Sequence, residues 1–248
     1  MTEPASPQTL AVDVGGTGVK ASVLDGAGQM LAPRVRVPTP NPCKPQTLLQ
    51  AIADLTAQLP AFDRVSIGFP GVIRDGKTIT APHFDADAWR NFPLAQAVSR
   101  HFGKPTRLLN DAEVQGLGII AGQGVGRGLE VVLTLGTGVG SAVFRDGVLA
   151  PHLELSLHPI GRGRKTYNDY VGEQARHKIN ARKWNRRVLK MIAIVESLLH
   201  YDVLYLGGGN SAKLGSDLPA NVHVASNDTG ITGGIHLWDA AFGGNKTG

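Results

Sequence analysis

Residues 12–26 of this chain read Val-Asp-Val-Gly-Gly-Thr-Gly-Val-Lys-Ala-Ser-Val-Leu-Asp-Gly, and residues 133–147 read Leu-Thr-Leu-Gly-Thr-Gly-Val-Gly-Ser-Ala-Val-Phe-Arg-Asp-Gly. Each stretch predicts an apolar strand, a tight turn of glycine and threonine, a second apolar strand and an Asp-Gly turn. Alternation in the first copy puts Asp13 on the face opposite Leu10, Val12 and Val14. The recurrence predicts a chain built from two similar halves.

The two glycine turns are candidate phosphate-binding loops. Glycine lets backbone N–H groups approach an anion closely, and a threonine hydroxyl adds a donor. Two ordinary β-hairpins are the alternative, but the recurrence of glycine, threonine and Asp-Gly in one order favours a pair of loops that clamp a polyphosphate. Neither turn is a Walker A loop or a Rossmann fingerprint, because no Gly-Lys-Ser/Thr follows and the first turn leads into a strand. The candidate phosphate-binding residues are Gly15, Gly16, Thr17, Gly136, Thr137 and Gly138.

Composition restricts the class of protein. The chain has 248 residues, of which 42% are hydrophobic; this suits one globular protein with two lobes and a sizeable core. No apolar run is long enough to span a bilayer and no signal peptide is visible, so we expect a cytoplasmic protein without a membrane partner. The single cysteine, Cys43, excludes an internal disulfide and a cysteine-cluster zinc site.

Positive charge is concentrated between residues 162 and 190. The net charge is +5 and the sequence pI is about 9.5. A solvated helix face is the ordinary interpretation of such a run, and a track for a polyanion is the functional one. No aromatic ladder accompanies it, so nucleic acid is not an expected partner. The cations of this stretch are Arg162, Arg164, Lys165, Arg176, Lys178, Arg182, Lys183, Arg186, Arg187 and Lys190.

Strand and helix patterns alternate along the chain, which predicts an α/β fold. We expect two lobes, residues 1–110 and 111–248, with the active cleft between them. Strands are predicted at residues 65–67, 107–109, 130–135, 203–206 and 222–225, besides the two hairpins. Helices are predicted at residues 47–59, 93–102, from 111 onward, 166–179, 184–200 and 232–240.

Three carboxylates are candidates for catalytic or binding roles. Asp13, beside the first glycine turn, could organise Mg²⁺ or cap the turn, and Lys20 beyond it could neutralise phosphate or be a surface charge. Asp111 follows a short strand and opens a helix, so it is a candidate general base for a hydroxyl that attacks phosphorus, or a helix N-cap. Glu154, in an otherwise apolar loop, suits paired sugar hydroxyls or an ion pair with a nearby arginine.

A third glycine run, Gly207, Gly208 and Gly209, ends a predicted buried strand. The carboxyl edge of a sheet is the usual ligand face of an α/β protein. The run could bring backbone close to an adenine or a ribose, or could be a tight turn.

Taken together, these motifs resemble the ROK family of sugar kinases, within the actin–hexokinase superfamily, over residues 10–238. Residues 13–20 and 135–140 are similar to the two phosphate motifs, 68–71 to the sugar loop, and 207–209 to the adenosine-side motif. The resemblance implies a duplicated, ribonuclease H-like fold and a homodimer. It implies that Asp111 is the catalytic base, that Asn110 contacts the sugar, and that Pro70 and Gly71 belong to the sugar site.

The polyphosphate glucokinase branch of this family is the most similar, since it too lacks the cysteines of the family's zinc signature. Two departures fall in the sugar site. His83 follows Ala81-Pro82 where the family has asparagine, and Leu157 stands where the family has a sugar-binding histidine three residues after the glutamate. His158 could replace that histidine by a shift of one residue.

These features predict a carbohydrate kinase. It would use Mg²⁺ to transfer the terminal phosphoryl group of polyphosphate or ATP to the primary hydroxyl of a hexose, with glucose the expected acceptor. The alternative is a degenerate ROK protein that binds sugar or phosphate without catalysis.

Overall fold

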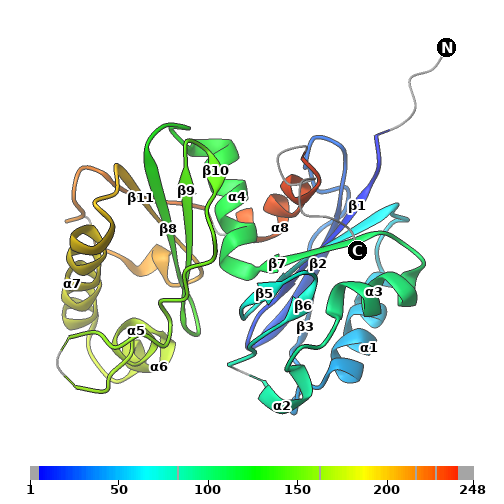
Figure 1. The fold of residues 1–248 in the computed structure, drawn as a ribbon, viewed down its shortest axis with the longest axis horizontal. Helices are drawn as coiled ribbons and strands as arrows, with labels where there is room; N and C mark the ends of the chain where they lie inside the picture. Colours follow the sequence, from blue (N-terminus) through cyan, green and yellow to red (C-terminus); the bar gives the residue numbers. More distant parts are fainter. Residues whose placement is uncertain (1–5, 83, 162, 216, 227, 240–248) are drawn as a thin grey trace. The chain divides into compact units, whose positions relative to one another are not determined.

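The computed structural model describes residues 6–82, 84–161, 163–215, 217–226 and 228–239 (Figure 1). The chain divides into two compact units: unit 1 comprises Met1–Gly118 and Asp228–Gly248, and unit 2 comprises Ile119–Asn227. This division differs from a boundary after residue 110. The difference arises because helix α4 (Asp111–Gln123) starts in unit 1, and because the chain returns to unit 1 at Asp228.

Unit 1 is built on a five-stranded sheet with the order β3-β2-β1-β4-β7. The predicted hairpin is present as β1 and β2, which are antiparallel, whereas β4 and β7 run parallel to β1. The strands are β1 (Thr9–Val14), β2 (Gly18–Leu24), β3 (Val35–Pro38), β4 (Arg64–Phe69) and β7 (Thr106–Asn110), and a separate small hairpin is formed by β5 (Ile73–Arg74) and β6 (Lys77–Thr78).

Both faces of the first sheet are covered. Helix α1 (Pro45–Thr56) and helix α3 (Leu94–Phe102) bury Leu48, Ile52 and Val98 in one core with the alternate β1 residues. Helix α8 (Thr229–Thr232) and the 3-10 helix η2 (Gly233–Trp238) cover the other face, where Ile231 and Ile235 pack on Ala11 and Leu24. The short helix α2 (Ala86–Trp89) buries Trp89 against Phe69, with ring centroids 4.8 Å apart.

Unit 2 repeats the topology of unit 1. Its sheet has the order β10-β9-β8-β11-β12, with an antiparallel β8–β9 hairpin and with β11 and β12 parallel to β8. The predicted duplication is therefore present in the strand order as well as in the sequence. The strands are β8 (Leu129–Leu135), β9 (Val139–Arg145), β10 (Val148–Leu149), β11 (Val203–Gly207) and β12 (Val222–Val224).

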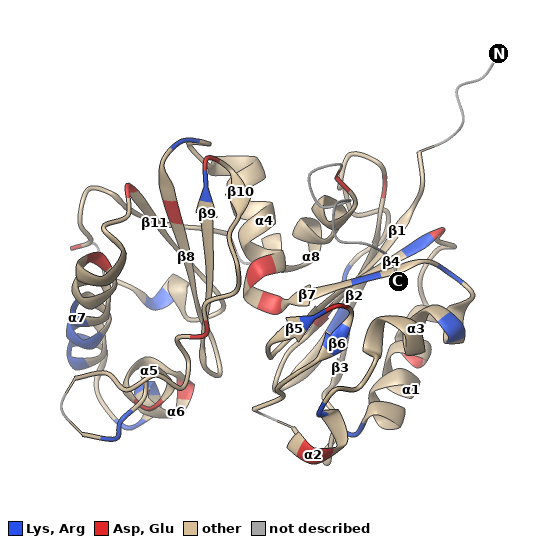
Figure 2. Ribbon diagram, viewed as in Figure 1, with Lys and Arg blue, Asp and Glu red and all other residues tan. Residues whose placement is uncertain are grey.

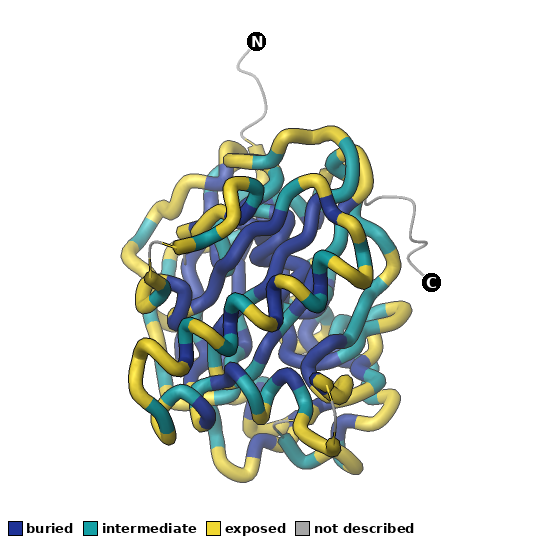
Figure 3. The backbone as a smooth tube through the Cα atoms, turned by 90° about the vertical axis from the view of Figure 1, so that its left-hand side faces the viewer, coloured by how far each residue is buried: buried dark blue, intermediate teal, exposed yellow. Residues whose placement is uncertain are grey.

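The second core forms between this sheet and its helices. Helix α7 (Ala181–Leu199) contributes Trp184, Val188 and Met191, and helix α5 (Tyr167–Val171) contributes Val171. Helix α6 (Glu173–His177) and the 3-10 helix η1 (Ser211–Lys213) complete the unit. Figure 3 shows buried residues along the strands and exposed ones on the connecting loops.

The predicted α/β class is confirmed, and two predicted helices are wrong in detail. The helix expected at 166–179 is two short helices, because Gly172 adopts extended backbone (φ −63°, ψ 172°) between α5 and α6. The helix expected at 232–240 is the short α8 followed by η2. None of the helices in the described ranges combines the length and apolar composition needed to cross a bilayer.

Candidate functional site

The candidate residues of unit 1 meet at one edge of its sheet. Since β1, β4 and β7 are parallel, their carboxyl ends lie together. The register pairs Asp13 with Gly68 and Phe69 with Asn110. The first glycine turn, the predicted sugar loop (residues 68–71) and the start of α4 therefore occupy one edge.

The first glycine turn is held mainly through its carbonyl groups. Thr39 Oγ1 donates to the Gly15 carbonyl at 2.6 Å, Arg36 donates to the Thr17 carbonyl at 3.1 Å, and the Gly15 N–H donates to Gly18 at 3.0 Å. Among the described residues, the N–H groups of Gly16 and Thr17 donate to no protein acceptor. Two neighbouring N–H groups without acceptors are the feature that an anion-binding loop requires.

A pocket adjoins this turn at Gly16. It has a volume of about 600 Å³. The glycine turn therefore borders open space at Gly16. The other lining residues are Thr39, Pro40, Asn41, Pro42, Cys43, Phe84 and Asp85.

Asp13 and Lys20 face each other across the first hairpin. Lys20 Nζ lies 2.9 Å from Asp13 Oδ2, and the two side chains are 27% and 19% exposed. Within the described ranges, no three His, Cys, Asp or Glu side chains gather to hold a metal ion. Mg²⁺ in phosphoryl-transfer sites is commonly held by one or two carboxylates, with water and substrate phosphates as the other ligands. A single accessible carboxylate beside a phosphate loop fits that pattern.

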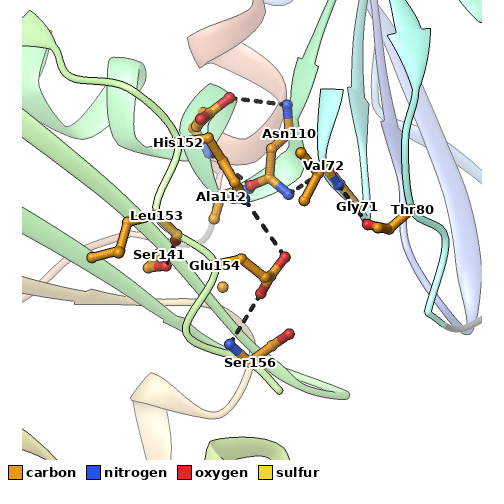
Figure 4. Close-up of polar contacts among 12 residues, drawn as sticks. Gly71, Val72, Thr80, Asn110, Ala112, Ser141, His152, Leu153, Glu154 and Ser156 are labelled. Carbon is orange, nitrogen blue, oxygen red and sulfur yellow. Dashed lines mark hydrogen bonds and ion pairs between the residues drawn. The ribbon is translucent and has the colours of Figure 1, made fainter. Parts of the chain in front are cut away.

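Asn110 joins the start of α4 to the sugar loop (Figure 4). Its side-chain oxygen accepts from the N–H of Ala112 at 2.9 Å and of Glu113 at 3.3 Å, so it caps the helix. Its amide nitrogen donates to the Gly71 carbonyl at 3.1 Å. The residue is only 4% exposed. Asn110 thus fixes the backbone around Asp111 and around the sugar loop at the same time.

Asp111 is the first residue of α4, as predicted. Its Oδ1 accepts from the N–H of Ala112 at 2.9 Å. Gly68 allows β4 to approach it, because a Cβ at Gly68 would lie 3.3 Å from the Asp111 Cα. Pro70 and Gly71 follow β4, and a Cβ at Gly71 would collide with the Thr80 carbonyl. His83, the remaining sugar-site candidate of this unit, lies outside the described residues.

The second glycine turn, like the first, is closed by a hydrogen bond between two of its own glycines, but this bond spans two residues instead of three. The Gly136 N–H donates to the Gly138 carbonyl at 2.9 Å, and the following strand is fixed by a 2.7 Å bond from Val139 N–H to Asn168 Oδ1. In the described part of the chain, the N–H groups of Thr137 and Gly138 find no protein acceptor. The repeated sequence has therefore produced a repeated pair of available donors.

A polar network braces this second turn. The Glu173 N–H donates to the carbonyls of Gly136 and Thr137 at 3.1 and 3.3 Å, and Asn210 Nδ2 donates to Gly136 at 3.3 Å. The Glu173 carboxylate accepts two bonds from Arg176, at 2.7 and 3.2 Å. The Arg176 bonds, opposed by partial burial and assisted by Asn210, lower the pKa of Glu173 to about 2. Glu173 is therefore an anion at neutral pH.

The third glycine run has two different parts. Gly208 has a φ of +83°, and a Cβ there would lie 2.6 Å from the Leu135 nitrogen. Gly207 and Gly208 are buried, whereas Gly209 is exposed and a Cβ there would meet nothing within 4 Å. Gly208 thus packs the run against the end of β8, just before the second glycine turn, and Gly209 is the member that a ligand can approach.

Glu154 has a histidine neighbour instead of the arginine that sequence reasoning considered. His152 Nε2 lies 3.6 Å from Glu154 Oε2, and Ser156 N–H donates to Glu154 Oε1 at 3.0 Å (Figure 4). Burial raises the pKa of Glu154, but the interactions with His152 and Ser156 outweigh it and hold the pKa below its usual value. By contrast, Leu157 is 56% exposed, and His158 is exposed with its ring 6.1 Å from that of Tyr167.

Sequence reasoning gave no site role to His152, Glu173 or Asn210. A signal existed for His152, because residues i and i+2 of an extended segment share a face. No local signal existed for Glu173 and Asn210, whose contacts with the second turn join segments far apart in the sequence.

The predicted basic stretch lies mainly on the α5, α6 and α7 segment of unit 2 (Figure 2). Arg182, Lys183 and Arg186 are exposed on the first turns of α7 and make no ion pair with any described residue. Arg187 and Lys190 lie over the Tyr170 ring at 4.8 and 5.8 Å. The first turn of α7 holds no acidic residue, although a helix N-terminus favours negative charge. Arg162 lies outside the described residues.

Known proteins were compared with this chain by sequence and by structure, and the two comparisons agree. The model of the ROK family matches residues 9–151, more than half of the chain. The polyphosphate glucokinase of Mycobacterium tuberculosis (strain ATCC 25177 / H37Ra) is 29% identical over 213 residues, which cover 84% of this chain and 80% of that protein.

Two solved structures share the fold. The inorganic polyphosphate/ATP-glucomannokinase of Arthrobacter sp. strain KM has a TM-score of 0.85 and 29% identity, over 93% of this chain and 98% of that one. A ROK family glucokinase from Streptomyces griseus, solved with glucose and AMPPNP, has a TM-score of 0.76 and 21% identity, over 93% and 98% of the two chains. The predicted actin/hexokinase-like duplicated fold is confirmed.

Proposed function

The chain belongs to the ROK family, and from that premise we propose that it is a carbohydrate kinase. It transfers the terminal phosphoryl group of polyphosphate or ATP to the primary hydroxyl of a hexose, with glucose the first acceptor to test. The similar proteins named as polyphosphate glucokinase and polyphosphate/ATP-glucomannokinase support this class of reaction. The homodimer that the resemblance implies stays a prediction.

The observation that carries the proposal is the matched pair of glycine turns. Each turn holds two consecutive N–H groups with no protein acceptor among the described residues: those of Gly16 and Thr17, and those of Thr137 and Gly138. Thr17 and Thr137 are exposed and Gly16 and Gly138 are half-buried, so these donors are open to a ligand. Phosphate oxygens satisfy such donors and match their positive potential.

Each remaining candidate has a proposed role. Asp111 accepts the proton of the attacking hydroxyl, and the bonds of Asn110 keep that carboxylate in place at the start of α4. Glu154 binds sugar hydroxyls as an ionised carboxylate, and Pro70, Gly71, His83 and His158 are further candidates for the sugar site. Gly209 and its neighbours Gly207 and Gly208 are proposed to face the nucleoside when ATP is the donor.

Asp13 is proposed to organise Mg²⁺. The ion, when bound, neutralises charge on the transferring phosphoryl group. Lys20, 2.9 Å from Asp13, keeps this carboxylate oriented along the hairpin and adds positive charge beside the first phosphate loop. Both residues belong to adjacent strands, so their positions are fixed by the sheet register.

The exposed cations on α7 support polyphosphate as a donor. Cations at the N-terminal end of a helix are electrostatically unfavourable, each by about 0.3–1 kcal/mol. Arg182 and Lys183 lie in the first turn of α7 and Arg186 lies about one turn later. None of the three has an ion-pair partner among the described residues, so a polyanion would relieve the repulsion in the first turn and find a further cation at Arg186. Binding of that kind weakens steeply as salt screens it.

The catalytic role is tested with Asp111→Asn. We expect turnover to fall by roughly 10²-fold or more, the range for loss of a general base, while sugar affinity changes far less. Coupled assays with glucose, Mg²⁺ and either donor measure turnover, and calorimetry measures sugar binding. Retention of near wild-type turnover would remove Asp111 from the role of base, and sugar binding by the wild-type protein without any turnover would identify a protein that only binds.

The donor is tested with Arg186→Gln, with Arg100→Gln as the matched control because it removes an exposed helix arginine from unit 1. We expect the KM for long polyphosphate to rise severalfold in Arg186→Gln at low salt, to converge with the wild type at high salt, and to stay unchanged in Arg100→Gln. Activity with ATP but none with polyphosphate at any salt would refute this donor.

A further inference from the structure

Glu154 and His152 form a pair on the extended segment that follows β10. His152 Nε2 and Glu154 Oε2 are 3.6 Å apart. The two side chains are 15% and 29% exposed, so both are mostly shielded from bulk water yet remain reachable. The other carboxylate oxygen, Oε1, is occupied by the Ser156 N–H at 3.0 Å. The Glu154 carboxylate is therefore anchored at one oxygen and turned toward an imidazole at the other.

The distance within this pair suits a bridging group. A separation of 3.6 Å is too long for a good direct hydrogen bond between nitrogen and oxygen. A hydroxyl oxygen placed about 2.8 Å from each atom would close the gap with two normal hydrogen bonds. It would donate its proton to the carboxylate and accept the N–H of the imidazole, which uses both capacities of a hydroxyl.

The residues that follow Glu154 do not offer the same arrangement. Leu157 has no polar group in its side chain and is 56% exposed. The backbone N–H of His158 donates to the Leu155 carbonyl at 3.1 Å, and its ring lies 6.1 Å from that of Tyr167. Of the histidines near Glu154 in the sequence, His152 is the one whose ring nitrogen lies beside the carboxylate.

We propose that His152 and Glu154 together bind one hydroxyl of the sugar acceptor, so that His152 is a specificity-determining residue of this chain. The inference rests on the proposed function, since it takes the ligand of Glu154 to be a hexose. Its consequence is selectivity at one position of the ring: a sugar that lacks that hydroxyl leaves the 3.6 Å separation between the carboxylate and the imidazole unbridged.

The test compares His152→Ala and His152→Gln with the wild type, and His101→Ala, which removes an exposed histidine from α3 of unit 1, serves as the matched control. Sugar KM and kcat are measured at saturating donor, and sugar Kd is measured by calorimetry without donor. We expect His152→Ala to raise KM and Kd about tenfold, as loss of one hydrogen bond allows, with little change in kcat. Glutamine keeps a donor at a similar distance from the backbone, so His152→Gln should stay within about threefold of the wild type. The control His101→Ala should match the wild type.

Monodeoxy hexoses identify the hydroxyl. We expect one deoxy sugar to bind the wild type much more weakly than the parent hexose, and to lose most of that disadvantage in His152→Ala. Should the alanine variant fail to fold, His152→Leu fills similar space without a donor and serves in its place. Melting temperatures equal to that of the wild type establish that a change in Kd is local.

Three negative results have different meanings. If the wild type phosphorylates a hexose but His152→Ala leaves KM, Kd and the deoxy-sugar preference unchanged, the role of His152 is refuted and the kinase proposal stands. If the wild type binds a hexose without phosphorylating it, the kinase proposal fails, while the calorimetric comparison still decides the role of His152. If no hexose binds at all, both proposals fall.

Discussion

Gly208→Ala probes how the third glycine run supports the second glycine turn, the proposed phosphate loop of unit 2. Gly208 has a φ of +83°, and a Cβ there would lie 2.6 Å from the nitrogen and 2.5 Å from the oxygen of Leu135. The left-handed backbone costs alanine about 1–2 kcal/mol, and overpacking against backbone costs about 1–3 kcal/mol more. We therefore expect a loss of about 2–5 kcal/mol, which lowers the melting temperature by about 4–20 °C at about 2–4 °C per kcal/mol.

The matched control is Gly209→Ala, one residue away. A Cβ at Gly209 would meet nothing within 4 Å, so we expect a change in stability within about 0.5 kcal/mol. Melting temperature and denaturant midpoint measure stability, and donor KM reports on the loop, because Leu135 directly precedes Gly136. Equal stability of the two variants, or a less stable Gly209→Ala, would refute this account of the glycine run.

Three further changes test the geometry. Glu173→Gln should lower the melting temperature at pH 7. The folded pKa of Glu173 is depressed from 4.5 to about 2, so its contribution to stability is present above pH 4.5 and is lost as the pH falls toward 2. The difference in melting temperature between wild type and variant should therefore disappear over that range, and a difference that stays constant would contradict the prediction. Asn110→Ala removes a helix cap and the donor to Gly71 and should cost about 2–3 kcal/mol in chemical denaturation, whereas a loss under 0.5 kcal/mol would show that these bonds contribute little. Leu157→His should lower the glucose KM about tenfold if the sugar site lacks a hydrogen bond there; an unchanged KM, together with a sharp rise in His158→Ala, would instead make His158 the sugar ligand and overturn the role argued for His152.

Local patterns predicted most of the fold, and tertiary contacts decided the exceptions. The periodicity across residues 166–179 is helical, yet the chain breaks at Gly172. The Glu173 N–H leaves the helix to bond the carbonyls of Gly136 and Thr137, and a Cβ at Gly172 would lie 2.9 Å from the Thr137 carbonyl. These partners are more than thirty residues away in the sequence, so no local rule can anticipate them.

Some features of the candidate site were also predicted from the sequence, and others were not. Asp13 and Lys20 were expected on one hairpin, and the strand register brings them together. Asp111 was expected at a helix start and lies there. Asn110 was expected to contact sugar, and the structure adds two tasks that sequence reasoning did not foresee: it caps α4 and it holds Gly71. Such roles depend on the distance between two strand ends, which only the folded sheet fixes.

The return of the chain to unit 1 has a consequence for its synthesis on the ribosome. Ser66 donates to the Gly234 carbonyl at 2.7 Å and accepts from Trp238 at 2.8 Å. Arg64 and Arg107 stack on the Trp238 ring at 4.8 and 4.5 Å. Strands β4 and β7 therefore lack these contacts until residues more than a hundred positions later have been translated. Unit 2, by contrast, is one continuous segment. We expect the second unit to mature first during translation, reversing the usual order in which N-terminal domains fold, and the nascent first sheet to expose one apolar face until translation has passed Trp238.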